Sequence, residues 1–220
     1  MLDILPNRKA RDLIKFFLKF PREERLKVEY VVIDMNKVFY SVVQTCFPKA
    51  TVVADRYHVV RQAAWAMENV RKDRQKKLSQ EWRKYFKRYR YLLYKSPKKF
   101  SEEESDKLRV LLGISTDLEY AYKLKNSFRE VMRSHDSNTG KKLLADWVYF
   151  AESSGLEEFS KCTKAVHNWS DEILASFDCP YSNGYTEGCN NKTKALKRVC
   201  FGVRSFARLR NRILHCAGGT

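Results

Sequence analysis

Two aspartates each follow the end of a predicted strand, where their carboxylates could contribute to one ligand-binding site. Asp34 directly follows the β-branched run Val28–Ile33, and Asp55 directly follows the run Thr51–Ala54. Both runs have the composition of short strands that are buried on both faces. In open α/β sheets, ligands bind beyond the carboxyl ends of the parallel strands. Asp34 and Asp55 are therefore candidate site residues, and a phosphohydrolase that uses two aspartates is one chemistry compatible with them.

The segment between these aspartates predicts the element that makes their strands parallel. Val38, Val42 and Cys46 recur at helical spacing, and Pro48 follows shortly after them. A helix is expected over residues 37–45, because its apolar side chains would share one face and the proline would end it. A strand, a helix and a second strand in this order form a right-handed crossover. The first part of the chain therefore predicts an α/β fold.

A third acid, Glu187, stands near the start of a predicted helix that follows the turn at residues 182–184, with Thr186 as its expected cap. Its face carries an amide and two cations at +4, +7 and +11, namely Asn191, Lys194 and Arg198. A lone glutamate at a helix start usually balances the helix dipole. The polar face behind Glu187 favours a functional site over that simpler role.

The charge of the whole chain points to a polyanionic partner. Its 220 residues include 43 Lys and Arg against 26 Asp and Glu, a net charge of +17. This balance favours nucleic acid or an acidic membrane surface, although it also fits a merely basic soluble protein. No apolar run has the length of a signal peptide core or a membrane span. The six cysteines have no zinc-ligand spacing, so reduced thiols of a cytoplasmic protein are expected.

The middle of the chain shows no strand alternation and is predicted to be an all-helical insertion over residues 76–178. Its first part interleaves aromatic and basic residues. The aromatic residues Trp82, Tyr85, Phe86 and Tyr89 have the spacing of a buried helical stripe. That arrangement leaves basic side chains on the open face, namely Arg83, Lys84, Lys87 and Arg88. These cations are expected either to meet phosphates or to form a plain solvated face.

Two long motifs resemble those of a known family. Asp34 after a buried strand is followed by FPKATVVADRYHVV (residues 47–60), and later by SNGYTEGCNNKTKALKR (residues 182–198) with a glycine and an arginine-rich helix behind it. In order and spacing they resemble the bacterial DDE transposases of the insertion-sequence-L3 family, over nearly the whole chain. The resemblance implies that Asp34 is the second catalytic acid and Glu187 the third. Asp55 and His58 match a family element outside the triad, and Asn183 and Asn191 are motif residues.

The resemblance also implies a fold and a function. The fold would be an incomplete ribonuclease-H-like α/β fold with a short parallel sheet and a large helical insertion, mostly helical overall. Its parts would be residues 1–75, 76–178 and 179–220. The full-length protein would bind transposon ends and target DNA, as a homo-oligomer on DNA if it assembles. It would cleave and transfer DNA strands with two Mg²⁺ or Mn²⁺ ions held by Asp34 and Glu187. Lys194 and Arg198 would steady the substrate phosphates.

One part of that family pattern is not found in the sequence. Residues 2–5 are predicted to be a strand that leads into a helix over residues 9–20, which corresponds to the third strand of a ribonuclease-H-like fold. Asp3 would then not be the first catalytic acid. The chain is therefore expected to be the carboxyl-terminal part of a transposase, without the first acid and inactive alone.

Two other classes stay open on the residues alone. One is a basic nucleic-acid-binding module without chemistry, in which Asp34 and Glu187 would be unrelated in space. The other is the phosphohydrolase that uses Asp34 and Asp55, for which the sequence lacks a phosphate loop and a third parallel strand. The distance between the carboxylates of Asp34 and Glu187 separates these interpretations.

Overall fold

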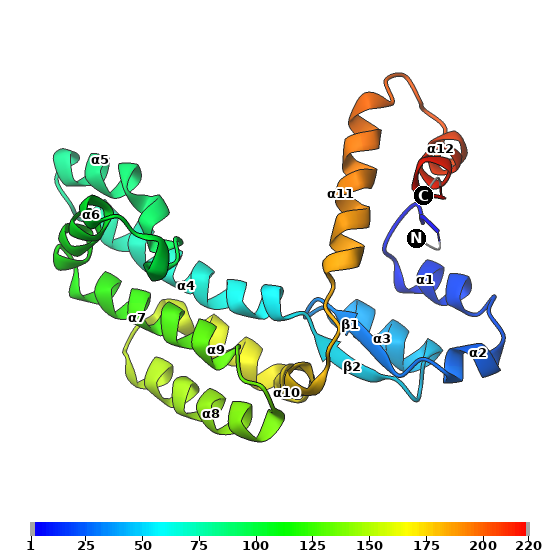
Figure 1. Cartoon of the computed structure of the whole chain (residues 1–220), viewed down its shortest axis with the longest axis horizontal. Coiled ribbons are helices and arrows are strands. Elements are labelled where there is room, and N and C mark those ends of the chain that lie inside the picture. The colour runs from blue at the N-terminus through cyan, green and yellow to red at the C-terminus, as the bar shows by residue number, and fades with distance from the viewer. Residues whose placement is uncertain (1–2, 219–220) are drawn as a thin grey trace. The chain divides into compact units, whose positions relative to one another are not determined.

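The computed structural model describes residues 3–218, which form two compact units (Figure 1). The first unit runs to Asp55 and resumes at Cys179, and the second spans Arg56–Asp178. Helices dominate both units, and the one sheet found within residues 3–218 has two strands. The predicted combination of a short parallel sheet with a mostly helical chain is therefore confirmed.

The sheet of the first unit pairs β1 (Tyr30–Ile33) with β2 (Thr51–Ala54) in parallel, in a register that sets Ile33 against Ala54. Helix α3 (Lys37–Cys46) makes the crossover between them. The helix begins at Asn36, whose side-chain oxygen accepts the N–H of Val38 at 2.8 Å. The predicted strand–helix–strand unit is thus present. Its first strand starts later than expected, at Tyr30.

Two helices precede the sheet, α1 (Ala10–Phe17) and α2 (Arg22–Leu26), and α1 packs on α3. The predicted strand at residues 2–5 is wrong for the residues that the structure describes, 3–5, and Leu2 lies outside them. No neighbouring strand is available there for pairing. Instead, the Asp3 carboxylate accepts hydrogen bonds from the Arg210 guanidinium at 2.6 and 2.9 Å. Asp3 is therefore a structural partner of the last helix.

The first unit ends with α11 (Gly184–Val199) and α12 (Phe206–Gly218). Helix α11 starts at Asn183, so the predicted cap Thr186 lies inside the helix. No residue of α11 is buried. Gly202, between the two helices, has φ of 75°, a conformation that disfavours other residues. Gly202 thus lies in the break between the two helices.

The second unit is all-helical. Its longest helix, α4 (Arg56–Lys76), packs along α7 (Thr116–Val131), as Figure 1 shows. The other elements are α5 (Gln80–Arg88), α6 (Glu102–Gly113), α8 (Ser137–Ser153), α9 (Ser160–Asn168), α10 (Ser170–Asp178) and the 3₁₀ turns η1 (Arg90–Leu93), η2 (Pro97–Lys99) and η3 (Glu157–Phe159).

The structure divides the last part of the helical unit into short pieces and leaves the predicted aromatic stripe only partly buried. Residues 156–178 are three pieces, η3, α9 and α10, which turn around α4 and α8 and so bury Phe159 and Ile173 in one core. The aromatic stripe of α5 is buried only in part. Phe86 is fully buried, but Trp82 is 40% exposed, because it lies in the first turn of a short helix and packs edge-on against Tyr85.

Candidate metal and active site

The parallel register places Asp34 and Asp55 at the same edge of the sheet. Asp34 follows β1 and Asp55 follows β2, and the last residues of the two strands are register partners. The N–H of Asp55 continues the ladder by donating to the carbonyl of Ile33 at 2.8 Å. In the turn between β1 and α3, the N–H of Asn36 donates to the carbonyl of Asp34 at 2.6 Å. Local backbone geometry therefore fixes both aspartates.

Asp34, Asp55 and His58 each offer one ligand atom, and these atoms all lie within 4.8 Å of one another. Asp55 is buried, whereas Asp34 and His58 are half-buried. His58 reaches the aspartates because it lies in the first turn of α4, only three residues after Asp55. Two carboxylates and an imidazole suit a divalent cation: Mg²⁺ and Mn²⁺ favour the oxygens, and Mn²⁺ or Zn²⁺ also accepts the nitrogen.

Asp34 also lines a cavity of about 370 Å³ in the first unit. Apolar side chains of β1 and α3 form much of its wall, and Phe17 of α1 contributes as well. The polar side chains on the wall, besides Asp34, are those of Arg8, Asn183, Thr186 and Asn190. Helix α11 and the residue before it therefore bring amides and a hydroxyl to the cavity of Asp34.

Glu187 lies beside this wall but not in the acidic group. It is exposed in the first turn of α11, and its N–H donates to the carbonyl of Asn183 at 2.9 Å. Its sequence neighbour Thr186 lines the cavity, as does Asn190 one turn later. Within residues 3–218, the group of clustered ligand atoms contains Asp34, Asp55 and His58 without Glu187. The pairing of Glu187 with Asp34 stays a prediction.

The other predicted site residues lie on exposed helix faces. Asn191, Lys194 and Arg198 are exposed on α11, and Arg83, Lys84, Lys87 and Arg88 are exposed on α5. The sequence did not predict Asn190 and Thr186 as cavity residues. Their signal was the i, i+3, i+7 spacing from Asn183, which places all three on one side of a helix. No comparable signal pointed to Arg8.

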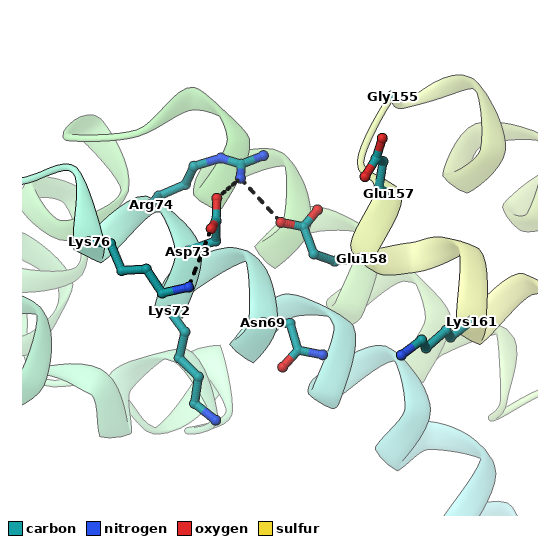
Figure 2. Close-up of a pocket in the computed structure, with 9 residues that line it drawn as sticks. All are labelled: Asn69, Lys72, Asp73, Arg74, Lys76, Gly155, Glu157, Glu158 and Lys161. Carbon is teal, nitrogen blue, oxygen red and sulfur yellow. Dashed lines mark hydrogen bonds and ion pairs between the residues drawn. The ribbon is translucent and has the colours of Figure 1, made fainter.

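A larger cavity, about 700 Å³, lies in the helical unit (Figure 2). Its wall mixes acids and bases, and Arg74 ties several of them together. Its guanidinium contacts Asp73 at 2.6 Å, Asp117 at 2.7 Å and Glu158 at 3.2 Å. These ion pairs join α4 to α7 and η3, so we interpret this cavity as a structural junction rather than a reaction site.

Comparison with known proteins identifies the family of this chain. The family model described as a transposase, that of the ISL3 type of DDE transposases, matches residues 1–213. The chain belongs to this family of insertion-sequence transposases. It is 26% identical over 207 residues to the transposase for insertion sequence element IS1001 of Bordetella parapertussis, covering 93% of this chain and 51% of that protein.

A second relative is the transposase for insertion sequence element IS1557 of Mycobacterium tuberculosis, 27% identical over 216 residues, covering 86% of this chain and 48% of that protein. The chain thus spans about half the length of the curated relatives it matches. No solved structure matches the chain. Among residues 3–218, no helix combines the length and the apolar composition needed to cross a membrane.

Proposed function

We propose that this chain carries part of the catalytic centre of a transposase that binds DNA and performs metal-dependent strand cleavage and transfer. The observation that supports the proposal most is the convergence of Asp34 and Asp55 at the carboxyl edge of a parallel sheet, with ligand atoms within 4.8 Å. Family membership supplies the DNA substrate. The proposed fold of the complete catalytic domain is ribonuclease-H-like, with the helical unit as its insertion.

The residues present fit a divalent cation, Mg²⁺ or Mn²⁺, and we propose two such ions in the complete enzyme. Asp34 would hold a cation together with Glu187, while Asp55 and His58 stand next to Asp34 as further donors. When bound, such ions stabilise the charge that develops at a phosphodiester during displacement. The carboxylates supply the negative charge that brings the cations to this edge of the sheet.

The phosphates of the substrate would meet cations on the exposed face of α11. Lys194 and Arg198 lie on the same side of this helix as Glu187. Asn190 and Thr186, on the wall of the Asp34 cavity, are placed to orient a strand by hydrogen bonds. We propose that α11 presents the DNA strand to the acids. Assembly of several copies on DNA is part of the same proposal.

Iron-directed cleavage of the protein tests this arrangement directly. Fe²⁺ occupies sites for Mg²⁺ and Mn²⁺, and with ascorbate and peroxide it cuts the backbone beside its ligands. We expect cuts in the purified 220-residue chain near residues 34 and 55, and near residue 187 if Glu187 joins Asp34. Excess Mg²⁺ should suppress these cuts, and Asp34→Asn should remove them.

The matched control is Glu23→Gln, which neutralises an exposed acid of the same unit on α2. That variant should keep the cleavage pattern. Cuts near residues 34 and 55 but none near 187 would separate Glu187 from the metal. An absence of specific cuts, together with intact DNA binding, would support the alternative of a binding module without chemistry.

A further inference from the structure

The last turn of α10 is held by an arginine from the first residue of α4. The Arg56 guanidinium donates two hydrogen bonds to the carbonyl of Ser176, one of them from Nε at 2.9 Å and the other from Nη2. The same guanidinium lies 5.4 Å from the centre of the Phe177 ring. Carbonyls in the last turn of a helix lack partners within the helix. Arg56 therefore caps the end of α10 from another element.

Helix α8 holds the same turn from a second direction. The Phe177 ring packs so closely on Gly140 that a Cβ at that position would lie 2.4 Å from the ring. The Asp178 carboxylate accepts the N–H of Ser137, in the first turn of α8, at 3.0 Å. Three consecutive residues, 176–178, are thus fixed by side-chain and backbone contacts within the helical unit.

These contacts stand at the two ends of the helical unit. Arg56 is its first residue and Asp178 its last. One peptide bond joins Arg56 to Asp55, and another joins Asp178 to Cys179. We use the name "clasp" for the contacts of Arg56 with Ser176 and Phe177. The clasp holds together the two points at which the chain passes between the units.

The segment that returns from the clasp leads directly to the candidate site. Residues 179–183 connect α10 to α11 and belong to the first unit. Within that unit, the Tyr181 ring lies 6.0 Å from the ring of Tyr30, at the start of β1. Asn183, at the end of the connector, lines the cavity of Asp34. The connector therefore determines how the first turn of α11, with Glu187, meets the edge of the sheet.

We propose that Arg56 is a positioning residue for this site: the clasp fixes the point from which the connector starts, and thereby the approach of Glu187 to Asp34. The second half of this inference rests on the proposed pairing of Glu187 with Asp34, whereas the first half does not. A merely structural Arg56 would affect only the stability of α10 and its neighbours.

Hydrogen exchange of the whole chain tests the first half. Arg56→Met keeps an unbranched apolar stem but removes the guanidinium donors. Because the loss of hydrogen bonds from a charged group weakens the turn that they hold, exchange in residues 176–190 should quicken about tenfold or more, while α7 keeps its protection. The control is Arg61→Met on the same helix, which removes a cation 4.2 Å from the Trp65 ring and should leave the connector unchanged.

Mn²⁺ affinity tests the second half. Arg56→Met should weaken binding by about tenfold, as loss of groups that orient ligands typically does, and Arg56→Lys should recover part of it. If Arg56→Met also loses the protection of α7, Arg56→Lys replaces it as the test variant for both measurements. Unchanged exchange in residues 179–190 would overturn the proposal. Faster exchange confined to α10, with unchanged affinity, would also overturn it, since it would leave Arg56 a purely structural role.

The two proposals fail in different ways. If Glu187→Gln leaves the Mn²⁺ affinity of the wild-type chain unchanged, the pairing of Glu187 with Asp34 is wrong, and the exchange of residues 179–190 still decides whether the clasp holds the connector.

Discussion

Partners distinguish the aspartates of the first unit. Asp3 binds Arg210 through two hydrogen bonds, of 2.6 and 2.9 Å, which neutralises its charge within the fold. Asp34 and Asp55 instead gather with His58, so that three potential ligand atoms lie within 4.8 Å of one another. The Asp3–Arg210 pair joins the two ends of the first unit, whereas the group around Asp34 concentrates potential metal ligands at one point. The partners of these aspartates thus separate a structural acid from candidate metal ligands.

The Asp3–Arg210 pair gives a prediction for stability at low pH. The hydrogen bond from Arg210 lowers the pKa of Asp3 below its ordinary 3.8. The stabilisation is therefore fully present above that value and is lost as the pH falls through the lower pKa of the folded state. Asp3→Asn should lower the free energy of unfolding at pH 7 by about 0.5–1 kcal/mol. The difference from wild type should shrink as the pH falls below 3.8 in urea titrations, and a constant difference would contradict this account.

Lys125, in α7, gives a second prediction for the pH dependence of stability. Its amine is buried, donates to the carbonyl of Leu93 at 2.8 Å, and has its pKa lowered by burial from 10.5 to about 8. Between these two values the unfolded chain binds more protons, so the stability of the folded state rises with pH. Relative to Lys125→Met, the wild type should gain on the order of 3 kcal/mol from pH 8 to 10.5.

The control for that measurement is Lys123→Met. Lys123 lies on the same helix but is exposed and pairs with Glu119 at 2.6 Å. The free energy of unfolding of this control should follow the wild type across the same pH range. Parallel curves for wild type and Lys125→Met would show that the Lys125 amine titrates as it does in the unfolded chain.

At the scale of elements, the contact between α8 and α10 sets two effects against each other. Replacing a glycine inside a helix by alanine usually gains about 1 kcal/mol. At Gly140 the new methyl group would lie 2.4 Å from the Phe177 ring, and overpacking of this kind costs about 1–3 kcal/mol or more. Gly140→Ala should therefore destabilise the helical unit.

Thermal unfolding checks this prediction, with Gly113→Ala at the end of α6 as the control. No atom lies within 4 Å of a Cβ at Gly113, so that variant should be neutral or slightly stabilised. If Gly140→Ala raised the melting temperature, the packing of Phe177 on α8 would be looser than described.

The elements that the sequence predicted best are those whose own residues decide them. The run Thr51–Ala54 is β-branched and flanked by a proline turn, and it forms the predicted strand. In the same way, α6 starts at a capping box formed by two residues close in sequence, Ser101 and Glu104. Residues 3–5 do not form the predicted strand, because a strand needs a second strand to pair with. Asp3 instead binds Arg210, which comes from the far end of the chain. Pattern alone does not show such a partner.

For the candidate site too, the sequence predicted the positions that neighbouring residues decide and missed those that depend on distant contacts. Asp34 and Asp55 follow consecutive parallel strands, so the crossover brings them together without help from distant residues. The relation of Glu187 to Asp34 depends instead on how the chain returns from the helical unit through residues 179–183. Side-chain contacts such as those of Arg56 with Ser176 decide that return, and no periodicity in the sequence reveals them.

At the scale of the whole molecule, the charge of +17 predicts binding to duplex DNA that weakens steeply with salt. Removing one cation that neutralises a phosphate should flatten the slope of log K against log salt by about 0.9. Changing Arg83, Lys84, Lys87 and Arg88 together to Gln should flatten it by up to about 3.6 if all four meet phosphates. Fluorescence anisotropy at several salt concentrations measures this slope.

The control for that variant removes the same number of charges elsewhere in the helical unit. Each of these cations pairs with an acid three or four residues before it in the chain: Lys107, Arg109, Lys123 and Arg133. Their joint replacement by Gln should change the slope less. Equal slopes for the two variants would assign the binding to net charge rather than to the face of α5.

The central claim, that Asp34 and Asp55 form a metal-binding edge, is tested most directly by titrating the chain with Mn²⁺ and following free Mn²⁺ by electron paramagnetic resonance. We predict saturable binding that Asp34→Asn weakens by about tenfold or more, because a ligand is removed, and that Glu23→Gln preserves. Equal affinities for wild type and Asp34→Asn, or an equal loss in Glu23→Gln, would contradict the account.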